Sequence, residues 1–226
     1  MQPATIEIPA PLAPGQTITP APLIAGDRGA DISRWNVITD WPALARDMRF
    51  LFVRATMGAS GVDSKFTQYW GAAKGAGVAW LGVYHLFIKE DDPTRQADNL
   101  LRVTGGDLGN LPVVVDVELR QTAGEAVAPG LRKMVAERLR FLAEELAQRT
   151  GRPPIIYTSK YMAGEMLGAF FDAYSRFYGL FVADYSGPVN YPSGWKQHTF
   201  HQRGTFKPTW ATGPIDDDVY SGAPLT

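Results

Sequence analysis

The feature that most constrains the fold of this 226-residue chain is the alternation of short strand-like runs with helix patterns. Runs rich in β-branched and aromatic residues lie at 30–32, 50–55, 80–87, 112–118, 154–158 and 180–183. Helix patterns lie between most of them, at 40–46, 64–76, 92–104, 129–150 and 160–167. Such alternation is typical of parallel sheets, because the chain must cross back over the sheet before each new strand. The sequence therefore predicts a single α/β domain.

The helix patterns carry recognisable ends. Asp92 followed by Pro93 predicts an N-cap and first turn, and Gly151 followed by Pro153 predicts the end of the longest helix. An apolar residue recurs every three or four positions along that helix, which predicts one buried face. The residues of this apolar face are Leu131, Val135, Leu139, Leu142 and Leu146.

The pattern changes after residue 180. Residues 185–195 and 203–214 are rich in Gly, Pro and Ser, so the last strands must connect without long helices. A complete eight-unit barrel needs about 250 residues, more than this chain has. The fold is therefore either a shortened barrel with a helix-free end or an open doubly wound sheet. Residues 31–35 after the first strand read Asp-Ile-Ser-Arg-Trp, without the glycine-rich loop of a dinucleotide-binding fold.

Composition excludes several functions. The net charge of -1 leaves no basic excess for nucleic acid, and no apolar run is long enough to span a bilayer. The chain has no cysteine, which rules out disulfides, thiol catalysis and thiolate metal ligands.

Residues 1–27 contain six prolines and differ from the rest of the chain. Proline opposes helix and favours extended backbone, so we interpret this segment as an arm or linker, or as an extended strap on the surface of a domain at 28–226. A basic stretch followed by an apolar core is not seen near the first residue, so no signal peptide is expected there.

Two carboxylates end the most apolar strand of the sequence. Residues 111–118 read Leu-Pro-Val-Val-Val-Asp-Val-Glu, and alternation along a strand places Asp116 and Glu118 on one face with Val117 on the other. Their Cα atoms would be about 6.6 Å apart. The carboxyl end of a buried parallel strand is where α/β proteins place catalytic groups. This pair is the leading candidate for catalysis, with capping of a helix or pairing with arginine as the structural alternative.

The other strand ends supply an acidic and aromatic set of residues. Carboxylates transfer protons and stabilise positive charge on a sugar ring, and aromatic faces stack on sugars, so the set suits glycoside hydrolysis. We expect Val117 and the adjacent strands to desolvate Glu118, and an ionised Asp116 to raise its pKa further, as a general acid requires. The set comprises Asp31, Ser33, Thr56, Tyr84, His85, Asp116, Glu118, Tyr157, Ala183 and Asp184.

Other polar residues give weaker signals, and neither a metal nor a cofactor is expected. His198 and His201 lie in a strand-like segment, where three-residue spacing does not bring them together on one face. Residues 216–218 are three consecutive aspartates, interpreted as an exposed acidic turn. His85 is interpreted as a hydrogen-bonded core histidine. Residues around the serines lack a nucleophile elbow, which argues against a serine esterase or deacetylase.

Taken in order, the motifs resemble glycoside hydrolase family 25, the lysozymes or N-acetylmuramidases of phages and bacteria. The resemblance runs from about residue 29 to residue 222. The motifs that carry it are Gly-Ala-Asp-Ile-Ser-Arg-Trp at 29–35, Asp63 with Phe66, Gly-Val-Tyr-His-Leu-Phe at 82–87, Gln-Ala-Asp-Asn at 96–99, Pro-Val-Val-Val-Asp-Val-Glu at 112–118, Ile-Ile-Tyr-Thr at 155–158, Val-Ala-Asp-Tyr at 182–185 and Gly-Pro-Ile-Asp at 213–216.

The resemblance implies an irregular TIM-like barrel, with five βα units and then about three strands without long helices. It implies cleavage of the β-1,4 bond between N-acetylmuramic acid and N-acetylglucosamine in peptidoglycan. Glu118 would be the acid, assisted by Asp116, with Asp31 and Asp216 as further carboxylates of the groove. The implied substrate-binding residues are Tyr84, Tyr157, Tyr185, Trp35, Phe87 and Gln202. The spacing of Asp116 and Glu118 lies between the carboxylate separations of retaining and inverting glycosidases, so it does not decide between the two routes.

Two residues depart from the family pattern. Met57 stands where the family commonly has a glutamate, and His201 stands where an aromatic residue usually precedes the glutamine. These departures leave a second hypothesis open, in which the chain is a non-catalytic wall-binding module or a structural part of a virion. In either case the expected partner is bacterial peptidoglycan, reached by a secreted or phage-encoded protein, and a monomer is favoured.

Overall fold

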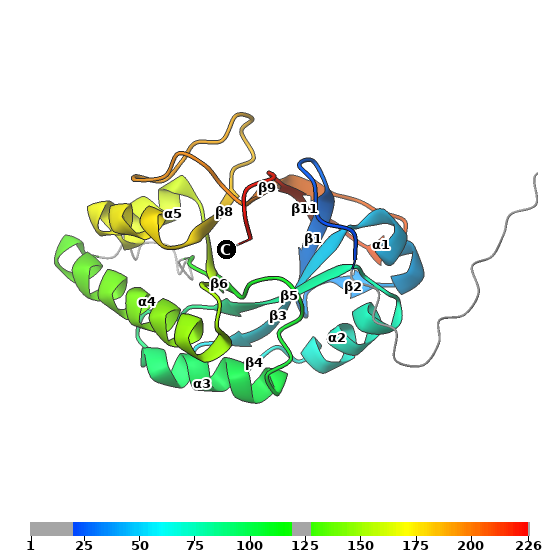
Figure 1. The fold of residues 1–226 in the computed structure, drawn as a ribbon, viewed down its shortest axis with the longest axis horizontal. Helices are drawn as coiled ribbons and strands as arrows, with labels where there is room; N and C mark the ends of the chain where they lie inside the picture. The colour runs from blue at the N-terminus through cyan, green and yellow to red at the C-terminus, as the bar shows by residue number, and fades with distance from the viewer. Residues whose placement is uncertain (1–19, 119–127, 226) are drawn as a thin grey trace, which may run out of the picture.

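The computed structural model describes residues 20–118 and 128–225, and within this part of the chain eight strands close into a barrel (Figure 1). Neighbouring strands are parallel except β11, which is antiparallel to both of its neighbours. The shortened barrel is therefore confirmed, and the open doubly wound sheet is wrong. In barrel order the strands are β1 (Arg28–Ile32), β3 (Phe50–Met57), β5 (Trp80–Leu86), β6 (Val114–Asp116), β7 (Ile155–Thr158), β8 (Gly179–Ala183), β9 (Phe200–Phe206) and β11 (Ile215–Tyr220), which returns to β1.

Five βα units make up the first part of the barrel, as expected, and the strands after them connect without long helices. The helices lie around one side of the barrel, and the orange and red strands close the other side (Figure 1). Short strands β2 (Val37–Ile38) and β10 (Ala211–Thr212) pair with each other, and β4 (Gly61–Val62) pairs with β3. The helices are α1 (Trp41–Asp47), α2 (Phe66–Gly75), α3 (Pro93–Thr104), α4 (Pro129–Thr150) and α5 (Lys160–Met166), which the 3-10 helix η1 (Gly168–Arg176) follows.

Local sequence explains where the helices begin and end. Asp40 caps α1 by accepting a hydrogen bond from the Ala43 backbone N–H, and Asp92 caps α3 by accepting one from the Arg95 N–H. Gly151 ends α4 at a φ of 72°, a left-handed conformation that glycine adopts without steric cost. These ends fix the lengths of the crossovers, and so where each following strand enters the barrel.

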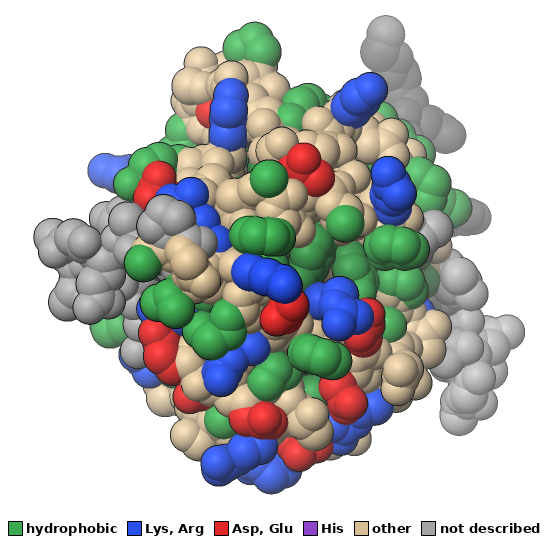
Figure 2. All heavy atoms as spheres, turned by 90° about the vertical axis from the view of Figure 1, so that its left-hand side faces the viewer, with side chains coloured by type: hydrophobic (Ala, Val, Ile, Leu, Met, Phe, Trp, Pro, Cys, Tyr) green, Lys and Arg blue, Asp and Glu red, His purple; other side chains and the backbone are tan. Residues whose placement is uncertain are grey.

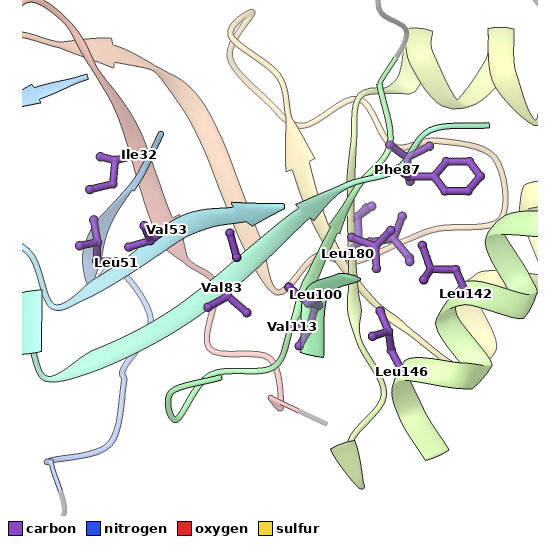
Figure 3. Packing of buried hydrophobic residues seen from close by; sticks show 14 of the residues in the cluster. Ile32, Leu51, Val53, Val83, Phe87, Leu100, Val113, Leu142, Leu146 and Leu180 are labelled. Carbon is purple, nitrogen blue, oxygen red and sulfur yellow. The ribbon is translucent and has the colours of Figure 1, made fainter. Parts of the chain in front are cut away.

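The core has two layers, one outside and one inside the barrel. The outer layer packs the strands against the helices, with Leu100 of α3 and Leu142 and Leu146 of α4 facing the sheet (Figure 3). The inner layer is aromatic and includes Phe50 and Phe52. Further inner members are Tyr84, Leu111, Val114, Ile155, Phe181, Phe200 and Tyr220.

Two glycines make room for the inner aromatic rings. A Cβ atom at Gly29 would lie 2.3 Å from the Phe50 ring, and one at Gly82 would lie 2.5 Å from the Phe52 ring. Both distances are far inside van der Waals contact, so any larger residue there would push the ring aside.

Residues 20–27 of the predicted arm lie against the barrel. The Ala21 carbonyl accepts hydrogen bonds from Arg49 Nη2 and Trp80 Nε1, each at 3.0 Å, and the Gly26 N–H donates to the Tyr220 carbonyl at 2.9 Å. The rest of the arm, residues 1–19, lies outside the described residues. Within the described residues, the helices lack the length and apolar character needed to cross a membrane.

The surface on the α4 side carries charges of both signs. Acidic and basic side chains alternate there with apolar ones (Figure 2). Several charges on α4 pair along the helix, such as Arg140 with Glu144 at 2.7 Å and Lys133 with Glu137 at 3.9 Å. Exposed pairs of this kind contribute at most about 1 kcal/mol each to folding stability.

Candidate active site

The predicted pair of acids, Asp116 and Glu118, lies at the end of β6, the fourth strand of the barrel, and faces a pocket. Strand β6 is shorter than the predicted 112–118 and ends at Asp116, but the Val117 N–H still donates to the Tyr157 carbonyl at 2.9 Å. The extended path therefore continues to Glu118. Asp116 and Glu118 both line the pocket, and Val117 is buried in the outer core.

The pocket has a volume of about 220 Å³ and lies at the mouth of the barrel, the end where the parallel strands have their carboxyl ends. Strand β11 runs in the opposite direction, so its first residues reach the same mouth and bring Asp216 to the pocket. The sequence pattern thus brings four predicted acids to one place. The lining residues are Asp31, Phe52, Arg54, Tyr84, Val114, Asp116, Glu118, Tyr157, Phe181, Tyr185, Gln202 and Asp216.

Gln202 of β9 connects both sides of the pocket. Its Oε1 atom accepts hydrogen bonds from the Tyr157 hydroxyl at 2.9 Å and the Tyr185 hydroxyl at 2.6 Å. Its Nε2 atom donates to Asp31 Oδ2 at 2.7 Å. Burial and the surrounding acids raise the pKa of both tyrosines, which keeps the hydroxyls protonated as donors. The orientation of the Asp31 carboxyl therefore depends on residues from three other parts of the chain.

Arg54 places a cation in the floor of the pocket. Its Nε atom donates to Asp63 Oδ2 at 2.8 Å, and both side chains are buried. Asp63 also accepts the backbone N–H groups of Arg34 and Lys65, which holds the pair in place. The Nη2 atom of Arg54 is buried without a hydrogen-bond partner among the described residues.

Burial raises the pKa values of both Asp116 and Glu118. Burial raises the pKa of Asp116 well above its usual value, the charge of Glu118 raises it further, and Arg54 opposes both effects. The pKa of Glu118 is raised by partial desolvation, again opposed by Arg54. The repulsion between the two charges is mutual, so Asp116 and Glu118 titrate as a pair, and the expectation that Asp116 raises the pKa of Glu118 stays a prediction.

The pKa values of the two acids on the opposite wall, Asp31 and Asp216, are raised as well. Burial raises the pKa of Asp31 to about 8, with the charge of Asp216 adding to it and the Gln202 hydrogen bond opposing it. Burial and the charge of Glu118 raise the pKa of Asp216 to about 6. The pocket therefore retains protons that isolated carboxyl groups would lose at neutral pH.

The interpretation of residues 216–218 as an exposed acidic turn is wrong. They lie in β11, with a register shift between Asp216 and Asp218 where the strand pairs with β9. Asp217 points away from the pocket to Arg28 and Arg203, at 2.7 Å from each. Asp218 is fully buried. The apolar residues on both sides of the three aspartates were the available signal for a strand.

Two predicted substrate-binding residues lie away from the pocket. Phe87 is buried in the outer core near Leu142, on the helix side of the strands, so its predicted contact with substrate is wrong (Figure 3). Trp35 is 74% exposed beyond the end of β1, where its ring packs under Arg34, and it is not part of the pocket lining. Of the predicted substrate-binding residues, Tyr84, Tyr157, Tyr185 and Gln202 line the pocket.

The histidines have structural contacts. His85 is fully buried between Thr56 and Gln96, as expected for a core histidine, and burial lowers its pKa to about 4. His198 Nδ1 lies 2.9 Å from the Tyr191 hydroxyl. His201, one of the departures from the family pattern, donates from Nε2 to the Asp184 carbonyl at 2.8 Å and so supports the loop that carries Tyr185.

A mostly parallel barrel with four acids and three tyrosines around one pocket at its mouth has the architecture and site chemistry of a glycoside hydrolase. The comparisons agree, since the model of glycosyl hydrolases family 25 matches residues 30–205. The chain belongs to this family and is an enzyme of the lysozyme class.

Individual proteins and a solved structure are also similar to this chain. The chain is 32% identical over 202 residues to the Escherichia coli O6:H1 protein called "Uncharacterized protein YegX", covering 86% of this chain and 69% of that one. It is 29% identical over 219 residues to Lysozyme M1 of Streptomyces globisporus, covering 92% of this chain and 72% of the relative. The crystal structure of the bacterial lysozyme from Streptomyces coelicolor has the same fold, with a TM-score of 0.76 and 23% identity over 88% of this chain and 94% of that one.

Proposed function

We propose that the protein hydrolyses peptidoglycan at the β-1,4 bond between N-acetylmuramic acid and N-acetylglucosamine, with Glu118 as the general acid. The observation that carries the proposal is the state of Glu118. Its carboxyl group lines the pocket and accepts no hydrogen bond from a described residue, and its pKa is raised. A general acid needs both access to the leaving group and a pKa near the working pH.

The reaction would begin with a glycan strand lying across the mouth. Glu118 gives its proton to the bridging oxygen as the bond from that oxygen to the sugar C1 carbon breaks. Water then supplies a hydroxyl group to C1, and its remaining proton returns to Glu118. The two sugars leave as a new reducing end and a new non-reducing end.

Asp116 would assist from beneath the reacting sugar. It lies deeper than Glu118, and the two acids repel each other's charge, so together they hold one proton more tightly than isolated carboxyls do. When Glu118 holds that proton, Asp116 carries the negative charge. That charge stabilises the positive charge that develops at C1, or orients the 2-acetamido group. Arg54 keeps Asp116 from binding the proton too strongly.

The exposed aromatic ring of Tyr185 suits the apolar face of a sugar. Its side chain is 60% exposed at the mouth, and its hydroxyl is fixed on Gln202. Asp31 and Asp216 across the pocket would accept hydrogen bonds from sugar hydroxyl and amide groups. An aromatic wall beside a row of acceptors is a common way to bind carbohydrate.

A Glu118→Gln variant tests the proposal. We expect it to release new reducing ends from purified peptidoglycan at least about 100-fold more slowly than the parent, because the amide cannot donate a proton of suitable acidity. Glu137→Gln, which changes an exposed glutamate on α4, is the matched control and should be unaffected. A Glu118→Gln variant as fast as the parent would overturn the role of Glu118.

Product analysis tests the bond. After borohydride reduction, a muramidase gives fragments that end in reduced N-acetylmuramic acid, whereas a glucosaminidase gives reduced N-acetylglucosamine. We expect the first product by mass spectrometry. A parent protein that binds cell walls but releases no reducing ends would instead indicate the non-catalytic wall-binding module.

A further inference from the structure

We propose that Asp218 is present as a carboxylic acid and donates its hydrogen to Asp31, so that the two carboxyl groups share one proton and Asp31 is held in position for the substrate. Asp218 would be a positioning residue, since it acts through Asp31. The inference rests on the proposed function for the place of Asp31 in the reaction, and it adds a residue that the sequence motifs did not single out.

Asp218 faces the interior of the barrel. It lies opposite Gln202 on β9 and opposite Gly29 on β1. Cross-strand partners project to the same side of a sheet, so Asp218 and the pocket residue Gln202 share the inner face. The surroundings there are apolar, because the Phe50 ring fills the space over Gly29 and packs against Phe200 with ring centroids 4.8 Å apart.

An ionised Asp218 would have no hydrogen-bond donor among the described residues to stabilise its negative charge. The side chain is fully buried, and neither of its oxygens receives a hydrogen bond from an N–H or O–H donor of the described residues. Gln202, the cross-strand partner of Asp218, donates to Asp31 Oδ2 at 2.7 Å, which places the Asp31 carboxyl group beside that of Asp218, and the two groups interact. Two ionised carboxylates cannot hydrogen-bond to each other, so this contact requires a proton on one of them.

The charged groups on the surrounding strands do not compensate Asp218. Arg28 of β1 and Arg203 of β9 both bind Asp217 on the outer face of β11. His201 of β9 donates to a loop carbonyl instead. Asp216, the remaining acid of β11, adds negative charge.

The hydrogen bonds decide which of the two carboxyls holds the proton. Asp31 accepts the Gln202 Nε2–H in addition to its interaction with Asp218, whereas the oxygens of Asp218 receive no N–H or O–H donor from the other described residues. The charges of Asp216 and Glu118 also face Asp31, but Asp31 has access to the pocket and Asp218 does not. Negative charge is therefore more stable on Asp31, and burial raises the pKa of Asp218 well above its usual value.

The shared proton has two consequences for the site. Asp31 receives one donor from Gln202 and one from Asp218, so its carboxyl plane is fixed and a remaining lone pair can face the pocket. The pair carries one negative charge instead of two, which limits its repulsion of the other acids at the mouth. Loss of the proton would add a second charge beside an aromatic interior.

Carbon-13 spectroscopy of the aspartate carboxyl groups tests the shared proton directly. In the parent protein we expect the signals of Asp31 and Asp218 to titrate together above pH 7. In Asp218→Asn one of these signals is absent, and the Asp31 signal titrates at lower pH. The amide N–H still donates a hydrogen bond to Asp31, but the amide does not ionise, so Asp31 no longer shares a proton with a second acid. Asp31→Asn identifies the second signal. Asp98→Asn, which changes an exposed aspartate of α3 that pairs with Arg149, is the matched control and should change neither.

Activity separates positioning from a purely structural role. We expect Asp218→Asn to keep kcat/KM within about threefold near pH 6, because the donor to Asp31 is retained, and Asp218→Leu to lose about tenfold or more. Two aspartate signals that titrate independently in the ordinary range would overturn the inference, as would an Asp218→Asn variant as impaired as Asp218→Leu. The spectra need no turnover, so their result stands apart from a failure of the Glu118 experiment.

Discussion

Arg54 and Asp63 form a buried ion pair, with Arg54 Nε 2.8 Å from Asp63 Oδ2, directly beneath the acids of the pocket. The side chains are 10% and 1% exposed, so water contributes little to either charge. A pair in this environment depends on the presence of both partners. It links the stability of the barrel to the electrostatics of the site, and two predictions follow from it.

Removing one partner should destabilise the fold. Asp63→Ala leaves Arg54 as an uncompensated buried cation, and we expect the free energy of unfolding to fall by about 3–5 kcal/mol. Urea denaturation followed by tryptophan fluorescence measures this change. Glu137→Ala removes one partner of an exposed pair and should cost less than about 1 kcal/mol. Equal losses in the two variants would contradict the difference in burial.

Replacing both partners by neutral residues should shift the pH profile. The charge of Arg54 lowers the pKa of Glu118, so Arg54→Gln combined with Asp63→Asn should raise that pKa. A general acid works in its protonated form, and the rate falls as the pH rises through its pKa. We therefore expect the alkaline limb of kcat/KM on soluble glycan fragments to move to higher pH. A limb that stays in place or moves to lower pH would show that Arg54 does not act on the acid.

Gln202→Leu should impair catalysis more than the loss of either tyrosine hydroxyl. The leucine removes the donor to Asp31 and the acceptor of Tyr157 and Tyr185 together. We expect kcat/KM to fall about 10- to 100-fold, because a hydrogen bond to a charged group contributes about 1.5–3 kcal/mol. Tyr185→Phe removes one donor and should fall less. The reverse order would mean that Tyr185 acts through the substrate and not through Gln202.

Asp218→Asn should stabilise the fold increasingly as the pH rises. Burial raises the pKa of Asp218 well above its ordinary value of 3.8, so above that value the folded state retains, on the Asp31–Asp218 pair, a proton that the unfolded chain has released. Stability therefore decreases as the pH rises above that value, and the asparagine variant escapes that loss. We expect a gain of more than about 1.4 kcal/mol at pH 8 and almost none at pH 4, since each unit by which the pKa is raised corresponds to about 1.4 kcal/mol. Denaturant titrations at both pH values measure it, and a gain that is the same at both would contradict the raised pKa.

The sequence predicted those parts of the fold that follow from local pattern. Helix ends at Asp40, Asp92 and Gly151 are encoded by residues beside them, and the parallel strands by runs of apolar residues. Closure of the barrel depends on β11, which follows glycine- and proline-rich segments and pairs with β1 at the other end of the barrel sequence. That long-range pairing is why two sheet topologies remained open.

The same contrast between local pattern and long-range pairing explains which site residues were misassigned or missed. The alternation that places Tyr84 inside the barrel also places Phe87 outside it, so the burial of Phe87 could have been predicted. Arg54, a lone cation in the run 50–55, required a buried partner, and Asp63 is only nine residues further on. Asp218 was hidden, because three adjacent aspartates resemble a turn until β1 and β9 close around them.

The aromatic interior described above also limits how a polymer can meet this enzyme. The rings of Phe50, Phe52, Phe181 and Phe200 contact one another across the barrel, with centroids 4.8–6.1 Å apart, so side chains of the described residues fill its interior. A glycan strand therefore cannot pass through the barrel. It has to bind across the mouth and dissociate from the same face, so both of its ends can extend beyond the protein.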